Sequence, residues 1–216
     1  MNIGIIGSGE MGGTLGKLLA RAGHKVLFSS RHPERLKQLV KEAGKNAASG
    51  TVEDAVKFGD VILFAINFSS MDDAVKRAHG LNGKIVIDIT NPVSWDEKNQ
   101  QLIQHLQPGK TAASKLKQSA PNARIVKAYS HLPAEHLVKD SNRAKEERIT
   151  VFHCGDDGEA KRIVAELIED SGFIPFDLGD LGQAALMEIP GPLAFKAVRL
   201  DEAKKLVDQL QQTRAA

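Results

Sequence analysis

Short apolar runs alternate along this chain with longer segments in which apolar residues recur every three or four positions. An apolar run over 2–6 stops at Gly7, and a helical pattern then continues to Gly23. Similar runs follow at 24–30, 60–67 and 84–92, with helical patterns after the first two. Strands that alternate with helices of about ten to fifteen residues predict βαβ units, and hence a parallel sheet with right-handed crossovers.

A stretch from Pro92 to Gly109, rich in proline, glycine and glutamine, interrupts this alternation. It resumes with a helix over 111–120, strands over 124–130 and 148–155, an amphipathic helix over 159–172 and a strand over 173–179. The pattern predicts an α/β fold of the Rossmann type, with a doubly wound, mainly parallel sheet, over residues 1–180. Residues 181–216 are expected to form a small C-terminal helical cap packed on this domain, because so short a segment rarely folds alone.

A glycine-rich turn joins the first predicted strand to the first predicted helix. It reads Gly7-Ser8-Gly9-Glu10-Met11-Gly12, which matches the dinucleotide-binding pattern G-x-G-x-x-G in the context that makes this pattern informative. Gly7 allows the tight turn, Gly9 lets the backbone approach a pyrophosphate, and Gly12 lets the helix pack against the sheet. The amides of residues 9–11 would point at the phosphates from a helix N-terminus. The turn therefore predicts a bound dinucleotide.

Hydroxyl and basic side chains follow the second strand, where an NAD-binding sequence places a carboxylate. The stretch KVLFSSRHPERL, residues 25–36, supplies Ser30, Arg31 and, one helical turn further on, Arg35. A serine hydroxyl and an arginine fork would bind a 2′-phosphate that a carboxylate would repel. The guanidinium of Arg31 could also stack on adenine, and His32 is a further candidate contact. The predicted cofactor is NADP(H) in preference to NAD(H), and the alternative is a solvated basic turn.

Ligands of open α/β sheets lie beyond the carboxyl ends of the strands. The candidates for the nicotinamide end of the site therefore follow three predicted strands. They are Ala65, Ile66 and Asn67, then Asn91 and Pro92, and then Ala128, Ser130 and His131. Asn67, Asn91 and Ser130 could bond the carboxamide or the ribose, although asparagine also favours such turns through its own backbone chemistry.

No acid–base pair and no metal site stands out in the sequence. His131 and His136 are candidate general acids, but loop histidines are more often solvated or structural, and no carboxylate is evident in the sequence that would orient either imidazole. His153 and Cys154 fall in a predicted strand and are expected in the core or at its edge. The histidines lack metal-ligand spacing, so no metal is predicted and the catalytic residues stay unassigned. Trp95 could cover a substrate or pack internally.

Composition indicates where such a protein would work. The chain has 216 residues, a net charge of +2 and scattered basic residues, so no nucleic-acid partner is predicted. A single cysteine excludes an internal disulfide and fits a reducing compartment. Met1 leads directly into a strand, and no apolar run is long enough to span a bilayer. We therefore expect a cytoplasmic protein with no membrane partner.

Residues 3–31, IGIIGSGEMGGTLGKLLARAGHKVLFSSR, resemble the start of the NADPH-dependent deazaflavin (coenzyme F-420) reductase family. They also resemble the NADPH domain of the six-transmembrane metalloreductases. Three later segments extend the resemblance, in the same order, over most of residues 2–182. They are ITNPV (89–93), VKAYSHLPAEHL (126–137) and VFHCGDDGEAKRIVAELIEDSGFIPFDLGDL (151–181).

The resemblance implies a Rossmann domain, typically in a homodimer, that moves a hydride between NADP(H) and a flavin-like acceptor. In the family pattern Ser30 and Arg31 match the 2′-phosphate signature, Arg35 matches a helix position that is often basic, and residues 7–11 match the pyrophosphate turn. The loop over 130–133 matches the one that borders the acceptor ring. Candidate acceptor contacts are therefore Ser130, His131 and Leu132. Hydride transfer depends on close stacking more than on an acid or a base.

The acceptor is the open point of this prediction. The resemblance fades after Leu181, and Ser130 stands where the family loop has histidine. Deazaflavin, FMN or FAD, and flavin-mediated ferric reduction all remain candidates. One alternative is a reductase of a small imine or carbonyl, whose families share the glycine turn but add a long helical C-terminal domain. Another is an NADPH-binding sensor or regulatory protein without turnover.

Overall fold

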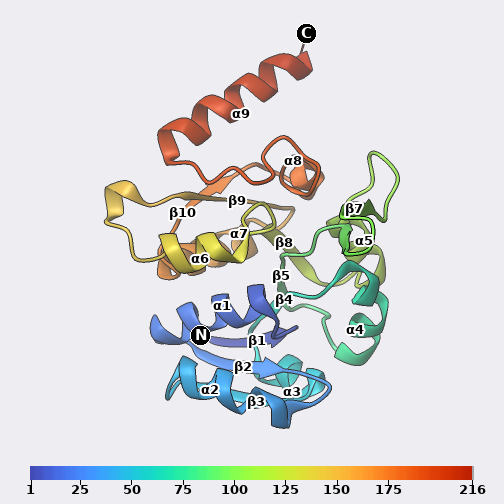
Figure 1. Cartoon of the computed structure of the whole chain (residues 1–216), viewed down its shortest axis with the longest axis vertical. Coiled ribbons are helices and arrows are strands. Elements are labelled where there is room, and N and C mark those ends of the chain that lie inside the picture. Colours follow the sequence, from blue (N-terminus) through green and yellow to red (C-terminus); the bar gives the residue numbers. More distant parts are fainter. Residues whose placement is uncertain (216) are drawn as a thin grey trace.

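The computed structural model describes residues 1–215 and confirms the predicted α/β fold (Figure 1). Its main sheet has eight strands in the order β10-β9-β8-β5-β4-β1-β2-β3. The strands are β1 (Asn2–Ile6), β2 (Lys25–Ser29), β3 (Ala47–Gly50), β4 (Val61–Phe64), β5 (Ile85–Asp88), β8 (Arg124–Ala128), β9 (Thr150–Gly155) and β10 (Ile174–Asp177). Neighbouring strands pair in parallel except β8 and β9, which are antiparallel. The sheet is therefore mainly parallel, as predicted.

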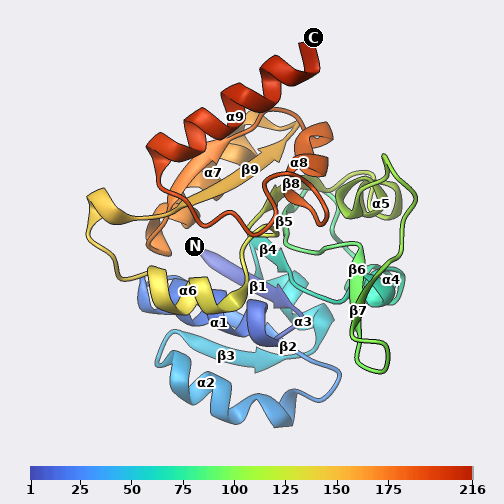
Figure 2. The same ribbon diagram turned by 45° about the horizontal axis from the view of Figure 1, so that its top comes forward.

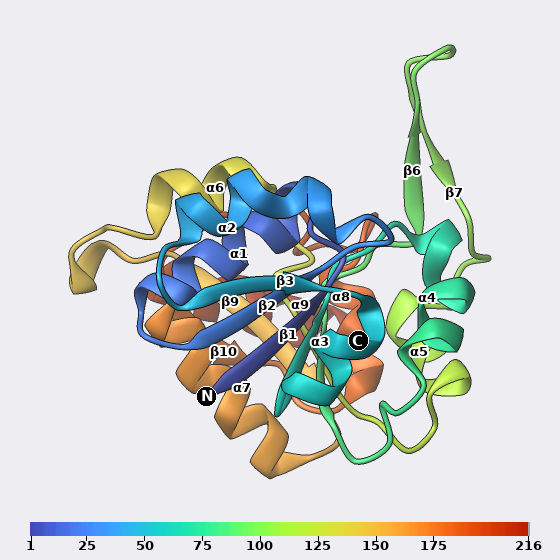
Figure 3. The ribbon, with the colours of Figure 1, turned by 90° about the horizontal axis from the view of Figure 1, so that it is seen from below.

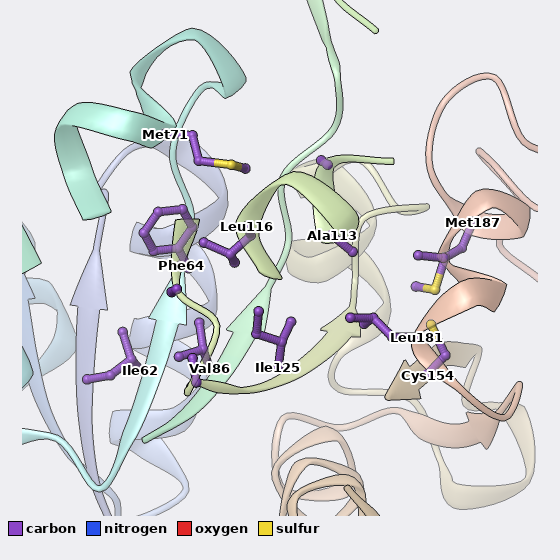
Figure 4. Close-up of a cluster of buried hydrophobic side chains, with 14 of the residues drawn as sticks. Ile62, Phe64, Met71, Val86, Ala113, Leu116, Ile125, Cys154, Leu181 and Met187 are labelled. Carbon is purple, nitrogen blue, oxygen red and sulfur yellow. The ribbon is translucent and has the colours of Figure 1, made fainter. Parts of the chain in front are cut away.

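Helices cover both faces of this sheet. They are α1 (Glu10–Arg21), α2 (Lys37–Ala43), α3 (Val52–Phe58), α4 (Met71–Ala78), α5 (Ala112–Ser119), α6 (Ala134–Asp140), α7 (Gly158–Asp170), α8 (Ala184–Met187) and α9 (Leu200–Ala215). One buried cluster packs the sheet against α1, α6 and α7, and a second packs it against α4, α5, α8 and α9. In the second cluster Phe64, Met71 and Leu116 point toward one another (Figure 4). Both faces are buried, which explains the uninterrupted apolar runs of the central strands.

Local capping sets the limits of several helices. Thr51 begins α3 with a capping box, in which its hydroxyl accepts from the Asp54 amide and the Asp54 carboxylate accepts from the Thr51 amide. The helix predicted from Pro33 begins as a 3₁₀ turn over Pro33–Leu36 and continues as α2. Helix α6 was not predicted, because its short apolar pattern lies within the loop that follows β8.

The interruption after β5 is a β-hairpin. Strands β6 (Val93–Asp96) and β7 (Gln101–Gln104) pair antiparallel as a separate two-stranded sheet that projects from the body of the molecule (Figure 3). Trp95 lies on this arm and is 55% exposed, so the expectation that it packs internally is wrong. Its position on the arm gives no support to a substrate-covering role either.

The C-terminal segment joins the core of the main sheet. Leu193, Ala203 and Val207 are buried in the same cluster as Phe64. In Figure 2 the chain between α8 and α9 passes above the central strands, and the amide of Ile189 there donates to Asn91 Oδ1, 2.9 Å away. Within residues 1–215 no helix combines the length and the apolar character needed to cross a membrane.

A buried ion cluster fixes the beginning of this segment. The Nζ atom of Lys127 lies 3.0 Å from Asp88 Oδ2 and 2.9 Å from Glu188 Oε1, and all three side chains are buried. Burial alone would lower the pKa of the Lys127 ammonium group, but the two carboxylates outweigh it and raise this pKa. Glu188 also accepts hydrogen bonds from the amides of Ala112 and Ala113 at the start of α5. The cluster thus ties α8 to the centre of the sheet.

Candidate functional site

The strand order reverses at β1, which has β2 on one side and β4 on the other. Beyond the carboxyl ends of these strands lies a cavity of about 420 Å³, called here the first cavity. This is the place at which open α/β sheets bind ligands. Many of the predicted cofactor contacts line it, namely Gly7, Ser8, Gly9, Ser30, Arg31, Ala65, Ile66 and Asn67.

The three glycines of the turn have the separate geometries that their predicted roles require. Gly7 has φ of 96°, and a Cβ there would lie 2.2 Å from the carbonyl oxygen of Ala65. A Cβ on Gly12 would lie 2.0 Å from the carbonyl oxygen of Gly7, so α1 can approach the turn only without a side chain at this position. A Cβ on Gly9 would meet no atom within 4 Å. The open space above Gly9 is where a pyrophosphate could approach the backbone.

The start of α1 leaves its amides free to bind an anion. Gly9 is the N-cap residue of this helix and provides no side-chain hydrogen bond to the first turn. Unsatisfied amides and the positive end of the helix dipole attract negative charge. Together with the space above Gly9, the helix N-terminus fits a dinucleotide pyrophosphate.

The end of β2 separates the two serines that precede Arg31. Ser29 is buried, and its hydroxyl donates to the carbonyl of Ile5 at 2.6 Å. Ser30 is half-buried, and its hydroxyl accepts from the His32 amide while it lines the first cavity. Arg31 is exposed and lines the cavity as well. Both side chains are therefore available to a ligand in the first cavity.

His32 and Arg35 are not brought to the first cavity. Both side chains are exposed and are absent from its lining. His32 instead lies 3.4 Å from the carboxylate of Glu34. Their predicted contacts with the phosphate stay predictions.

Two further side chains of the first cavity were missed in the sequence. Asp73 and Arg77 of α4 line its far side and form an i,i+4 salt bridge of 2.8 Å. The hydrogen bond from Arg77 lowers the pKa of the Asp73 carboxyl, and the charge of Arg31 acts in the same direction. The carboxyl end of β4 borders the site, and α4 is the next α-helix along the chain. This order was the feature of the sequence that could have identified Asp73 and Arg77 as candidate site residues.

A second cavity of about 370 Å³ lies on the other side of the glycine turn. Met11 and Asn91 line it together with Ser130, His131 and Leu132, and Ile189 and Phe195 close it from the C-terminal segment. The two cavities are adjacent in sequence at the glycine turn, since Gly9 lines the first and Glu10 the second. A dinucleotide that lies across the N-terminus of α1 would reach both cavities.

Asn91 and Ser130, two polar residues of the second cavity, differ in their hydrogen bonding within the protein. The amide of Asn91 donates to the carbonyl of Ser130 at 2.7 Å, and its oxygen accepts from the amide of Ile189. Asn91 therefore joins the β8 loop to the C-terminal segment. The Ser130 hydroxyl is buried and has no hydrogen-bond partner within the described chain. His131 Nδ1, which is also buried beside this cavity, likewise has no hydrogen-bond partner within the described chain.

Three other predicted contacts lie at the edges of the site. Gly12 packs α1 onto the turn, as described above. Ala128 is fully buried and lines neither cavity. Pro92 lines a separate pocket at the base of the hairpin.

His131 is a buried residue rather than a solvated one. It is 1% exposed, its ring lies 5.0 Å from that of Phe152, and its Nε2 donates to the carbonyl of Thr150 at 3.4 Å. Burial disfavours the charged imidazolium and lowers its pKa from 6.5 to about 4. A neutral imidazole at neutral pH is a poor general acid.

His136 has a carboxylate partner that the sequence did not reveal. Its Nδ1 lies 2.8 Å from Oδ2 of Asp140, one helical turn away on α6. Burial would raise the pKa of Asp140, but hydrogen bonds from His136 and Arg143 outweigh it and hold this pKa below its usual range. His153 and Cys154 are buried in the core, as expected. Within residues 1–215 no three His, Cys, Asp or Glu side chains gather as a metal site.

The fold and the first cavity define this protein as a dinucleotide-binding domain of the Rossmann type. The family model described as "NADP oxidoreductase coenzyme F420-dependent" matches residues 2–92. Metalloreductase STEAP3 of Rattus norvegicus is 31% identical over 189 residues, covering 86% of this chain and 35% of the relative. Metalloreductase STEAP2 of Mus musculus is 29% identical and is also covered over 35% of its length. The chain thus spans about a third of these relatives.

Two solved structures share both fold and sequence with this chain. A hypothetical protein of Sinorhizobium meliloti superimposes with a TM-score of 0.81 and 27% identity, over 92% of this chain and 95% of the other. A protein of Arthrobacter sp. FB24, provisionally named an F420-dependent NADP-reductase, superimposes with a TM-score of 0.75 and 27% identity. The superposition covers 85% of this chain and 87% of the other. An imine reductase of Aspergillus terreus, at 18% identity and a TM-score of 0.64, shares the fold alone.

These comparisons confirm the resemblance seen in the sequence. The chain is similar to the family described as NADP oxidoreductase coenzyme F420-dependent over residues 2–92, and to the metalloreductases STEAP3 and STEAP2 over most of its length. The comparisons agree with the predicted class of oxidoreductase and with the predicted cofactor, NADP(H).

Proposed function

We propose that this protein is an enzyme that transfers a hydride between NADP(H) and a flavin-like acceptor. The observation that carries the proposal is the pair of cavities on either side of the glycine turn, with Ser30 and Arg31 at the end of the first. The adenosine and 2′-phosphate would occupy the first cavity, and the nicotinamide would reach the second. NADP(H) supplies the hydride when it is bound.

The protein would contribute to this reaction by positioning NADP(H) and the acceptor. Arg31 and Ser30 would hold the 2′-phosphate, and the first amides of α1 would hold the pyrophosphate. Met11, Leu132 and Ile189 give the second cavity an apolar wall that would exclude water from the reacting carbons. Neither His131 nor His136 is arranged as a proton donor into this cavity, which agrees with a direct hydride transfer.

The second cavity supports our proposal for the acceptor class. Its apolar residues, beside a nicotinamide, suit a planar ring that stacks on the nicotinamide, which hydride transfer requires. Deazaflavin, FMN and FAD have such rings, and ferric reduction would proceed through a reduced flavin. We further propose, from the family resemblance, that the protein is a cytoplasmic homodimer.

Oxidation of NADPH by the purified protein tests the proposal. FMN, FAD, deazaflavin, a ferric chelate and small imino acids would be supplied in turn. Turnover above background with one of the flavin-like acceptors supports it. Turnover confined to the imino acids would identify an imine reductase. Tight NADPH binding with no turnover on any acceptor would identify a sensor and refute the enzyme.

A further inference from the structure

Phe195 is an exposed aromatic residue at the mouth of the second cavity. It is 57% exposed, although Leu193, two positions before it, and Val198, three positions after it, are buried. It lines the second cavity together with Leu132 and Ile189. The fold therefore places a large apolar ring in solvent beside the proposed acceptor site.

The backbone of Phe195 is also strained. Its φ is 63°, in the left-handed region that favours glycine and that bulky residues rarely adopt. The conformation is held by the main chain, because the amide of Phe195 donates to the carbonyl of His131 at 2.8 Å. Neighbouring turns add support, as Ala194 and Lys196 donate to the carbonyls of Gly191 and Leu193. Such strain persists where the surroundings determine it, commonly at ligand sites.

Neither exposure nor strain contributes to the stability of the fold. A glycine at position 195 would remove the strain and keep the same amide hydrogen bond to His131, so the chain has no structural need of a ring there. Phe195 lines the second cavity from the C-terminal segment, whereas Met11 and Leu132 line it from the start of α1 and from the loop after β8. A planar acceptor in this cavity would cover the Phe195 ring.

We propose that Phe195 is a specificity-determining residue that stacks on the planar ring of the hydride acceptor. Ring stacking and burial of apolar area both favour an aromatic partner at this position. The proposal rests on the proposed function above and adds the residue by which the acceptor is chosen. The C-terminal segment, in which the sequence resemblance fades, thereby supplies its own aromatic contact.

Two substitutions separate this role from a structural one. Phe195→Gly removes the ring and the strain together, whereas Phe195→Tyr keeps both. His79→Gly is the matched control, since His79 has φ of 34° at the exposed end of α4 and lines neither cavity. For each variant one measures the melting temperature, the KM for NADPH and the KM for the flavin acceptor that the parent protein turns over.

The expected result is a divergence between stability and acceptor binding. Phe195→Gly should melt at or above the parent temperature, raise the acceptor KM about tenfold and leave the KM for NADPH within about twofold. Phe195→Tyr should keep the parent acceptor KM, and His79→Gly should change neither KM.

Three results would overturn the proposal. They are an unchanged acceptor KM in Phe195→Gly, an equal rise in both KM values, and a loss of oligomer mass by light scattering with the acceptor KM intact. The last would assign Phe195 to a subunit contact. If the parent protein turns over none of the acceptors supplied in the NADPH oxidation assay, the proposed function is refuted, and the role of Phe195 is refuted with it. That assay uses only the parent protein, so the two failures are distinguishable.

Discussion

Arg31 stands at the rim of the first cavity and forms no salt bridge within residues 1–215. Ser30 beside it has a hydroxyl that still can donate, because its recorded hydrogen bond is one that it accepts. A free guanidinium next to a free hydroxyl donor is suited to a phosphate dianion. We therefore propose that the choice of NADP(H) over NAD(H) depends on these two side chains.

Replacing Arg31 by alanine should weaken NADPH binding selectively. A charge-assisted contact with the 2′-phosphate is worth about 1.5–3 kcal/mol, or a rise of about 10- to 100-fold in Kd. The affinity for NADH should stay unchanged, because NADH has no 2′-phosphate. Calorimetric titration with both cofactors measures the difference, and Arg21→Ala at the exposed end of α1 is the control. An equal loss of affinity for NADPH and NADH would exclude a contact between Arg31 and the 2′-phosphate.

His131 makes the folded state sensitive to acid. Its pKa lies near 4 in the folded protein and near 6.5 when exposed, so the unfolded chain binds the extra proton between these values. The folded state therefore keeps its full stability with respect to His131 above about pH 6.5. It loses part of this stability as the pH falls toward 4. The shift corresponds to about 3 kcal/mol in the free energy of unfolding.

Urea unfolding between pH 7 and pH 4 measures this dependence. His131→Phe keeps an aromatic ring against Phe152 and should flatten the curve, leaving the contribution of His153, whose pKa is also lowered by burial. A variant curve as steep as that of the parent would show that His131 is not the source.

The strand–turn–helix unit from β1 to α1 is the element on which cofactor binding rests. Its glycines are alike in sequence, but their surroundings differ, because Gly12 is tightly enclosed and Gly9 faces open space. One therefore serves the packing of α1, and the other serves the approach of a ligand.

Two alanine substitutions should separate these roles. Gly12→Ala places a Cβ against a backbone carbonyl and should lower the free energy of unfolding by about 1–3 kcal/mol. Gly9→Ala should leave the melting temperature unchanged, since its backbone is extended and its Cβ meets no atom, yet it should weaken NADPH binding. The outcome opposed to this assignment is a Gly9→Ala protein that binds NADPH like the parent.

The sequence predicted the elements of the main sheet better than those outside it. The periodicity of apolar residues located the strands and helices of the sheet, because burial on both faces leaves a strong pattern. The hairpin over β6 and β7 left none, because its strands bury little, and Leu102 is 50% exposed. The pairing of His136 with Asp140 depended on the unpredicted helix α6. Asp73 and Arg77 reach the first cavity only through the placement of α4 beside β4.

At the scale of the whole molecule, the two cavities are joined by the glycine turn and closed by the C-terminal segment. Lys127 and Glu188 hold that segment on the sheet, and Asn91 joins Ile189 to the β8 loop. None of these contacts was apparent in the sequence, because each joins residues about 40 or more positions apart. The proposed acceptor site is therefore built by tertiary contacts, whereas the proposed cofactor site is built around a local motif.

The most direct test of the account is a single turnover observed without oxygen. The protein is mixed with NADPH and a flavin-like acceptor, and the absorbances of the reduced nicotinamide and of the oxidised acceptor are followed together. We predict that both fall at one rate, and that NADPH deuterated at the transferred position of its nicotinamide lowers that rate. Bound NADPH that reduces neither FMN, FAD nor deazaflavin would contradict the account.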